Sequence, residues 1–254
     1  MANLKSQERN FWGYFKKIVK GEQKLPFLFK KILIFILKYV KLLKKFEEEK
    51  NMSIDLGQMQ QEQGRQTLNM TLKKGLKMTL KKGGNKLHNI NLLSGWDDTQ
   101  LKEDMDLDFL LMLYRNDEVT GVDGQVVYFD NLKEKGVLYT KDKKKGAASG
   151  DVEKVIINLD EVEPSVNRIR IINYIYEAEE RNQNFGQARN AYISIVNADE
   201  NFEEARFSLS GDFSLYSGVK IGDLIRKDDY WEFVAINEGV TGNHIEIANA
   251  NMEA

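Results

Sequence analysis

The sequence of 254 residues contains no cysteine, two histidines and two prolines. The absence of cysteine excludes disulfide bonds, thiolate metal sites and cysteine nucleophiles, and it suits a cytoplasmic location. With only His88 and His244, a histidine-rich zinc site and any catalytic scheme that needs several imidazoles are also excluded. Neither histidine lies beside a recognisable catalytic motif, so we expect both to be structural or surface residues.

The sequence also lacks an apolar run long enough to cross a membrane. The uninterrupted apolar stretch at residues 32–37 is far shorter than the roughly 20 residues that a bilayer requires. Lys30, Lys31, Lys38 and Lys41 would fall inside any window of that length, and each is costly at the bilayer centre. The same lysines exclude a secretory signal peptide. The sequence therefore predicts no transmembrane helix.

Charge is divided unevenly along the chain. Residues 1–50 carry thirteen Lys and Arg against five Glu, whereas the remaining residues carry twenty-four basic and thirty-four acidic residues. A basic head on an acidic body indicates two modules with different partners. We predict a basic amphipathic helical extension at residues 1–50, a polar linker at residues 51–66 and a body at residues 67–254.

The basic head has the pattern of two helices separated near Gly21 and Pro26. On the second helix, lysines gather on one side and apolar residues on the other. We predict that it contacts another protein, a second copy of the chain or an anionic membrane surface. The alternative is a helix folded onto the body's own core. The long aliphatic run disfavours nucleic acid as the partner. The residues expected to make contact are Phe11, Trp12, Phe15, Phe29, Ile32, Ile36, Lys38, Lys41, Leu43 and Lys45.

In the body the apolar pattern changes to a period of two. Short β-branched and aromatic runs alternate with clusters of Gly, Asn and Asp, which predicts a mainly β fold, an antiparallel two-sheet β-sandwich. Two short helices are predicted at residues 158–166 and 221–228. The expected strands lie at residues 67–72, 77–80, 109–114, 125–129, 137–140, 155–159, 168–176, 191–197, 205–210 and 231–237.

A series of motifs in the body resembles the tellurium-resistance TerD-domain family. In chain order these are LKKGGNKL, LLSGWDD, DLDFLLML, VVYFDNLK, SGDVEKVIINLDEVEPSVNRIRI, YEAEERNQNFGQARNAYISIVN, EEARFSLSGDFS and VKIGDLIRKDDYWEFVAINEG. The resemblance covers residues 67–240 and is most specific at residues 106–108 and 184–191. It implies a two-sheet β-sandwich, calcium binding by acidic loops, and bacterial resistance to tellurite and other stresses, including phage infection. Residues 1–50 are not part of the family pattern.

The resemblance implies a calcium site made of carboxylates from several segments. Asp106 and Asp108 flank Leu107, so on a strand both carboxylates point to one face while Leu107 points inward. Calcium takes six to eight oxygen ligands in a loose geometry, which such carboxylates supply. The alternative is a strand edge with solvated acids. The expected ligands are Asp106, Asp108, Asp142, Asp151, Glu153 and Glu177.

The loop at residues 140–154 departs from the family pattern. It keeps Asp142, Asp151 and Glu153, but Lys143 and Lys145 replace the Asn and Thr that the family favours. A charged lysine offers no lone pair and repels a dication. We therefore expect one calcium site to be weakened or lost. Alternatively, the lysines at positions 141 and 143–145 fill the site, which would make the chain a metal-independent relative.

The acidic stretch at residues 176–180 leads into the strand predicted at residues 191–197. The resemblance makes Glu177 a candidate ligand, whereas Glu179 and Glu180 are expected to be solvated. Gly186 is expected to take a positive φ in the tight connection before the strand.

No nucleophile elbow, P-loop, dinucleotide fingerprint or metal-histidine motif is present, so we do not expect an enzyme. The resemblance instead implies a binding and scaffold domain of a bacterial stress response that binds calcium, and the basic head predicts recruitment by the N-terminal helix. The alternative is a metal-independent structural component of a larger oligomeric assembly. The expected location is cytoplasmic, with membrane association through residues 1–50.

Overall fold

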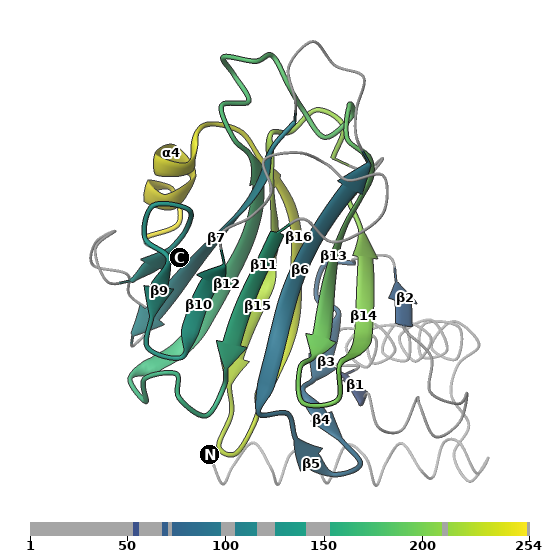
Figure 1. Cartoon of the computed structure of the whole chain (residues 1–254), viewed down its shortest axis with the longest axis vertical. Coiled ribbons are helices and arrows are strands. Elements are labelled where there is room, and N and C mark those ends of the chain that lie inside the picture. The colour runs from purple at the N-terminus through teal and green to yellow at the C-terminus, as the bar shows by residue number, and fades with distance from the viewer. Residues whose placement is uncertain are drawn as a thin grey trace, which may run out of the picture. The chain divides into compact units, whose positions relative to one another are not determined.

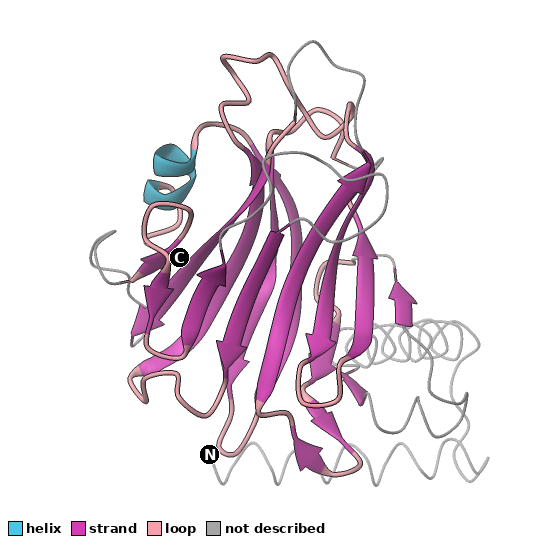
Figure 2. Cartoon of the chain, viewed as in Figure 1, coloured by secondary structure: helices cyan, strands magenta, loops and turns pink. Residues whose placement is uncertain are grey.

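A computed structural model describes residues 53–55, 68–70, 73–97, 105–115, 125–140, 153–209 and 213–252. These residues belong to one compact unit, Met52–Ala254. They form a mainly β structure of two layered sheets, as the sequence predicts (Figure 1, Figure 2). The helical extension predicted for residues 1–50 lies outside the described residues, and so do Asp142 and Asp151.

Sheet A, as we name the first layer, has seven strands among the described residues. In spatial order it consists of β1 (Ser53–Asp55), β3 (Lys77–Thr79), β16 (Trp231–Val240), β15 (Gly218–Arg226), β12 (Val166–Ile175), β7 (Leu107–Arg115) and β8 (Val126–Val127).

Sheet B, the second layer, also has seven described strands. In spatial order it consists of β2 (Leu68–Met70), β14 (Phe202–Ser208), β13 (Arg189–Asn197), β6 (Asn89–Asp97), β11 (Glu153–Asn158), β10 (Val137–Thr140) and β9 (Lys133–Glu134). A small hairpin of β4 (Lys81–Lys82) and β5 (Asn85–Lys86) connects the two sheets along the chain.

Two short edge strands depart from the antiparallel pattern. All other described neighbours pair antiparallel, but β1 pairs parallel with β3 and β2 pairs parallel with β14. The sequence pattern does not indicate β1, because residues 51–66 read as a polar linker. The structure shows that part of this segment extends sheet A, and that β2 extends sheet B shortly afterwards.

The core lies between the two sheets. Along β11 buried and half-buried residues alternate strictly, as expected for a strand with one face in the core. Phe207 of β14 and Phe233 of β16 stack across the layers with ring centroids 5.4 Å apart. The apolar face of each strand thus packs against the other sheet, and the polar end of the core described below is an exception.

β7 and β12 are buried on both faces because a helix covers the outer face of sheet A. The described part of the chain contains one helix, α4 (His244–Asn249), whose Ile247 packs in a cluster with Leu110 and Met112 of β7 and Ile172 of β12. This second cluster explains why residues 109–114 are continuously apolar rather than alternating.

Hydrogen bonds fix the segment that follows α4. Arg170 of β12 donates to Asp223 of β15 from Nε and Nη2 at 3.0 and 3.1 Å, and its Nη1 donates to Asn251 Oδ1 at 3.1 Å. Tyr114 of β7 donates to the backbone oxygen of Asn251. The buried guanidinium therefore has its charge partner and hydrogen-bond acceptors, as a buried ion requires.

Both helices predicted for the body are wrong. Residues 221–226 belong to β15 instead, and the residues between β11 and β12 form a turn. In that turn the Asn158 side chain accepts hydrogen bonds from the backbone N–H groups of Asp160 and Glu161. The prediction also misses β6 and β15, which are inner strands of sheet B and sheet A.

Candidate functional site

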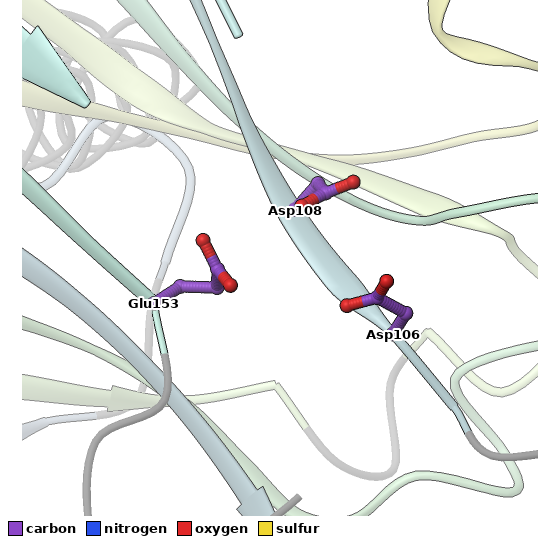
Figure 3. A group of neighbouring side chains, drawn as sticks. All are labelled: Asp106, Asp108 and Glu153. Carbon is purple, nitrogen blue, oxygen red and sulfur yellow. The ribbon is translucent and has the colours of Figure 1, made fainter. Parts of the chain in front are cut away.

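Three carboxylates meet at one end of the sandwich. Asp106 immediately precedes β7, Asp108 is the second residue of β7, and Glu153 is the first residue of β11 in the other sheet. One oxygen of each lies within 4.8 Å of the others (Figure 3). The sequence brings Asp106 and Asp108 to one face, as predicted, and the fold adds Glu153 across the layers.

Polar side chains replace apolar ones in the core at this end. Asn173 of β12 donates from Nδ2 to the backbone oxygen of Asp108 at 3.0 Å and to Ser94 Oγ of β6 at 3.4 Å. Glu153 pairs in register with Ser94, and both are fully buried. The cluster is therefore built into both sheets and is not carried by the surface of a loop.

Tyr139 of β10 bridges the two sheets at the cluster. Its hydroxyl lies 3.0 Å from Asp108 Oδ1 and 2.5 Å from Glu153 Oε2, and it accepts a hydrogen bond from the Phe109 N–H at 3.3 Å. Burial, together with the two neighbouring carboxylates, holds the pKa of Tyr139 well above its ordinary value. The phenol keeps its proton, and that proton is donated to one of the two carboxylates at a time.

Tyr174 approaches the same group from the outer side of sheet A. Its hydroxyl donates to Asp108 Oδ2 at 3.5 Å, a long contact. Burial and the charge of Asp108 raise the pKa of Tyr174. Two protonated phenols therefore surround Asp108, which is itself only 3% exposed.

The donor set fits a hard cation. Carboxylate and phenol oxygens suit Ca²⁺ or Mg²⁺, and the imidazole and thiolate ligands that characterise zinc sites do not belong to the cluster. Three oxygens within 4.8 Å of one another can surround an ion at distances up to about 2.8 Å, which includes the range of Ca²⁺–oxygen bonds. Asp106 is half-buried, so solvent reaches one side of the cluster.

Glu177 is exposed, and its role as a ligand stays a prediction. It lies outside the three-carboxylate group, and its carboxylate accepts from Arg181 Nη2 at 2.6 Å and from Nε at 3.2 Å. Glu179 and Glu180 are exposed on the same turn, as predicted. The other expected ligands, Asp142 and Asp151, lie outside the described residues.

Gly186 does not take the positive φ that we expected. The positive φ values near this connection belong to Glu177 (51°), Asn182 (51°) and Asn190 (50°). Gly186 instead passes close to the chain, because a Cβ there would lie 2.8 Å from the Ser214 backbone oxygen. The chain does make a tight connection here, but Glu177 and two asparagines supply its left-handed residues.

Tyr139 and Asn173 are members of the site that were not predicted from the sequence. Both lie within runs predicted only as strands, and the period of two places both side chains inward. A polar residue at an inward position of a predicted strand is the signal that would have found Asn173. The contacts of Tyr139 depend on the pairing of the two layers, which the pattern within one strand does not contain.

Within the residues that the structure describes, no helix is long and apolar enough to cross a membrane.

Similar proteins are found by sequence and by structure. The chain is 32% identical over 185 residues to "General stress protein 16U" of Bacillus subtilis (strain 168), covering 71% of this chain and 96% of that protein. It is 33% identical over 179 residues to "Tellurium resistance protein TerD" of Serratia marcescens, covering 69% and 93%.

A homologue of telluride resistance protein (TerD) from Streptomyces coelicolor A3(2) superposes with a TM-score of 0.51 at 18% identity, covering 64% of this chain and 95% of that one. At this identity the likeness concerns the fold alone. The TerD domain matches residues 68–250 of the sequence. The protein therefore belongs to the TerD domain family, as the motifs of its body predict.

Proposed function

We propose that this protein is a non-enzymatic binding domain of a bacterial stress response that holds calcium with Asp106, Asp108 and Glu153. The convergence of these three carboxylates carries the proposal. Relatives named for tellurium resistance and general stress support the biological setting. The resemblance to the family supports calcium as the ion.

Electrostatic repulsion gives the cluster a reason to bind a cation. Two unit charges 4.8 Å apart repel by about 3 to 4 kcal/mol at an effective dielectric constant of about 20. Three such pairs approach the whole stability of a domain, which is about 5–15 kcal/mol. A dication at the centre turns this repulsion into attraction, and calcium accepts the loose geometry that residues from two sheets provide.

A second candidate follows from the lysines at positions 141 and 143–145. They stand in the loop that the family uses for acidic and amide ligands, directly before Glu153. In this alternative a lysine ammonium replaces the metal, and the chain is a metal-independent structural component of an oligomeric assembly. The two candidates differ in one measurable property, the affinity for calcium.

Recruitment is the second part of the proposal. Residues 1–50 are basic and apolar, and they stand outside the segment that matches the family. We propose that they attach the body to a protein partner, to a second copy or to an anionic membrane, in the cytoplasm. No catalytic step is proposed, because the cluster contains carboxylates and phenols whose expected task is to hold an ion.

Calorimetric titration of the metal-free full chain with Ca²⁺ tests the calcium site. We expect one binding event that Glu153→Gln and Asp108→Asn each weaken by at least about tenfold, since each removes a charged ligand. Asp199→Asn is the matched control, because Asp199 is an exposed carboxylate bonded to Asn89 at the other end of sheet B. No heat of binding in the parent chain would reject calcium and favour the lysine alternative.

A further inference from the structure

Four aromatic rings gather beside the carboxylate cluster, on the loop after β8, the end of β12 and the start of α4. Phe129 packs edge-on against Tyr176 and His244, with ring centroids 5.3 and 5.2 Å apart, and Tyr128 stacks on His244 at 5.6 Å. The backbone N–H of Tyr176 donates to the backbone oxygen of Asp106 at 2.8 Å. These rings therefore form one surface adjoining the proposed cation site.

This surface is partly exposed. Phe129 is 36% exposed, and Ile245, the neighbour of His244 on α4, is 56% exposed. Phe129 and Ile245 therefore expose apolar area to water next to three further rings. Such a combination, with a polar border, is typical of an interaction surface.

The border of this surface is acidic. The described segments 125–131, 174–184 and 240–248 carry five carboxylates against one guanidinium, that of Arg181, and all five carboxylate residues are exposed. We name the aromatic rings, Ile245 and these carboxylates together the aromatic–acidic rim. Its acidic residues are Asp130, Glu177, Glu179, Glu180 and Glu246.

We propose that the aromatic–acidic rim binds the basic amphipathic segment, residues 1–50, of a second copy of this chain. The segment has the complementary composition, with thirteen Lys and Arg, five Glu and repeated Phe, Ile and Leu. Lysines would meet the exposed carboxylates and the faces of the rings, while apolar side chains cover Phe129 and Ile245. This inference names the partner in the proposed recruitment and rests on that role of residues 1–50, but it is independent of calcium binding.

A contact between the head of one copy and the rim of another is heterologous. Each copy then still offers one unoccupied rim or head unless a ring closes, so association extends beyond a dimer or ends in a closed ring. Because the contact pairs opposite charges near the surface, salt weakens it. Association of the full chain should therefore depend on both protein concentration and ionic strength.

Sedimentation of the full chain over a range of concentrations tests this inference. We expect self-association at low salt. Phe129→Asp and Ile245→Asp should each raise the dissociation constant of self-association at least about tenfold, because each removes apolar contact and adds repulsion among acidic residues. The matched control is Leu138→Asp. Leu138 is 44% exposed and lies on β10 next to Tyr139, with its side chain on the opposite face of the strand. Melting temperatures of the variants confirm that they fold.

Charge reversal identifies the partner segment. Lys38→Glu with Lys41→Glu should weaken association, and so should Glu179→Lys with Glu180→Lys. A mixture of these two variants restores it, because the reversed head of one variant meets the reversed rim of the other and the two unaltered surfaces also meet. Recovery of association in that mixture is the result that supports contact between copies.

Three outcomes would overturn the inference. The first is that the full chain is found to be monomeric at every protein and salt concentration. The second is that Phe129→Asp and Ile245→Asp associate like the parent. The third is that the rim variants lose only their binding to vesicles of anionic phospholipid. The first result excludes a second copy, the second excludes the rim, and the third assigns the rim to a membrane surface. None of them affects the calcium titration, so failure here is distinguishable from failure of the proposed cation site.

Discussion

The hydroxyl of Tyr139 lies between two carboxylates that belong to different sheets. Tyr139→Phe removes this bridge and leaves the Phe109 N–H without its acceptor. We expect the free energy of unfolding to fall by about 1–3 kcal/mol and calcium affinity to fall about 10- to 100-fold, because the carboxylates lose the group that orients them. Urea unfolding of the metal-free chain and calorimetric titration measure the two effects.

Tyr174→Phe is the control for that prediction. Tyr174 also points its hydroxyl at Asp108, but at 3.5 Å and without a contact to Glu153. Its loss should change calcium affinity only slightly. Equal effects of the two substitutions would show that the bridge between sheets has no special role in positioning the carboxylates.

Gly75 and Gly136 allow the cost of a positive φ to be distinguished from the cost of a steric clash. Gly75 and Gly136 have φ values of 81° and 80°, so alanine is strained to the same degree at both. At Gly75 an added Cβ meets nothing within 4 Å, whereas at Gly136 it would lie 2.4 Å from the Val162 backbone nitrogen. We expect Gly75→Ala to cost about 1–2 kcal/mol and Gly136→Ala several kcal/mol.

Urea unfolding of both alanine variants beside the parent measures this difference. Because φ is matched, the excess cost at Gly136 reports the clash with the backbone of the Glu161–Val162 turn. Similar costs would show that this turn moves aside easily.

Single residues also mark the limit of what the sequence predicts. The alternation along a strand suffices to put Asp106 and Asp108 on one face. Glu153 enters the expected site only through the family resemblance, since nothing within residues 153–158 shows what lies opposite. Glu177 was expected from the same resemblance; its carboxylate pairs with Arg181, and its role as a ligand stays a prediction.

At the scale of elements, the spacing of apolar residues alone assigns the wrong secondary structure where a bulge or a helix cap is present. Ile221, Leu224 and Ile225 are spaced three and four apart, which mimics a helix. The structure instead has a register shift between Lys220 and Gly222, which restarts the alternation within β15. No element is predicted for the residues of helix α4, whose Ile245 and Ile247 lack the three- and four-residue spacing of a helix.

A capping box was the available signal for α4. The Asn243 side chain accepts from the backbone N–H groups of Ile245 and Glu246, and the Glu246 carboxylate accepts from the Asn243 N–H. This pair fixes the first turn of a helix only six residues long. The capping box, rather than the spacing of apolar residues, is the sequence feature that indicates the helix covering the outer face of β7.

The docking of α4 should depend on pH through His244. Burial among aromatic rings holds the pKa of His244 below its ordinary value of about 6.5, while the Asp130 carboxylate acts in the opposite direction. Folding therefore favours the neutral ring. This contribution to stability is present above the unfolded pKa and is lost as the pH falls through the folded pKa, so we expect the melting temperature to drop below pH 6.5.

Comparison with His244→Gln isolates this effect. The variant lacks the titrating ring, so its melting temperature should fall less between pH 7.5 and pH 5.5 than that of the parent. His88→Gln serves as the control, because the exposed His88 ring is hydrogen-bonded to Asp160 at the far end of sheet B. Identical pH profiles of the parent and His244→Gln would contradict the prediction.

At the scale of the whole molecule, the two-sheet sandwich is predictable and its edges are not. Ten runs of period two require two layers to bury their apolar faces, and the structure agrees. The strand β1 comes from the polar stretch 51–66, which has no such pattern, and β2 lies within the predicted run 67–72, whose pattern does not indicate parallel pairing. Their pairing depends on open edges of β3 and β14, which exist only once the sheets have formed.

Calcium should stabilise the whole molecule. The direction in which Glu153→Gln shifts the metal-free melting temperature distinguishes the two proposed occupants of the site. At a calcium concentration about 100 times the dissociation constant, stabilisation is about 2.7 kcal/mol, equivalent to roughly 5–10 °C in melting temperature for a domain of this size. If calcium is the ligand, Glu153→Gln raises the metal-free melting temperature, because it removes one of three repelling charges, and abolishes the calcium shift. If a lysine fills the site, the same substitution breaks an ion pair and lowers the metal-free melting temperature. Thermal unfolding with calcium and with chelator measures both, and Asp199→Asn should keep the full shift.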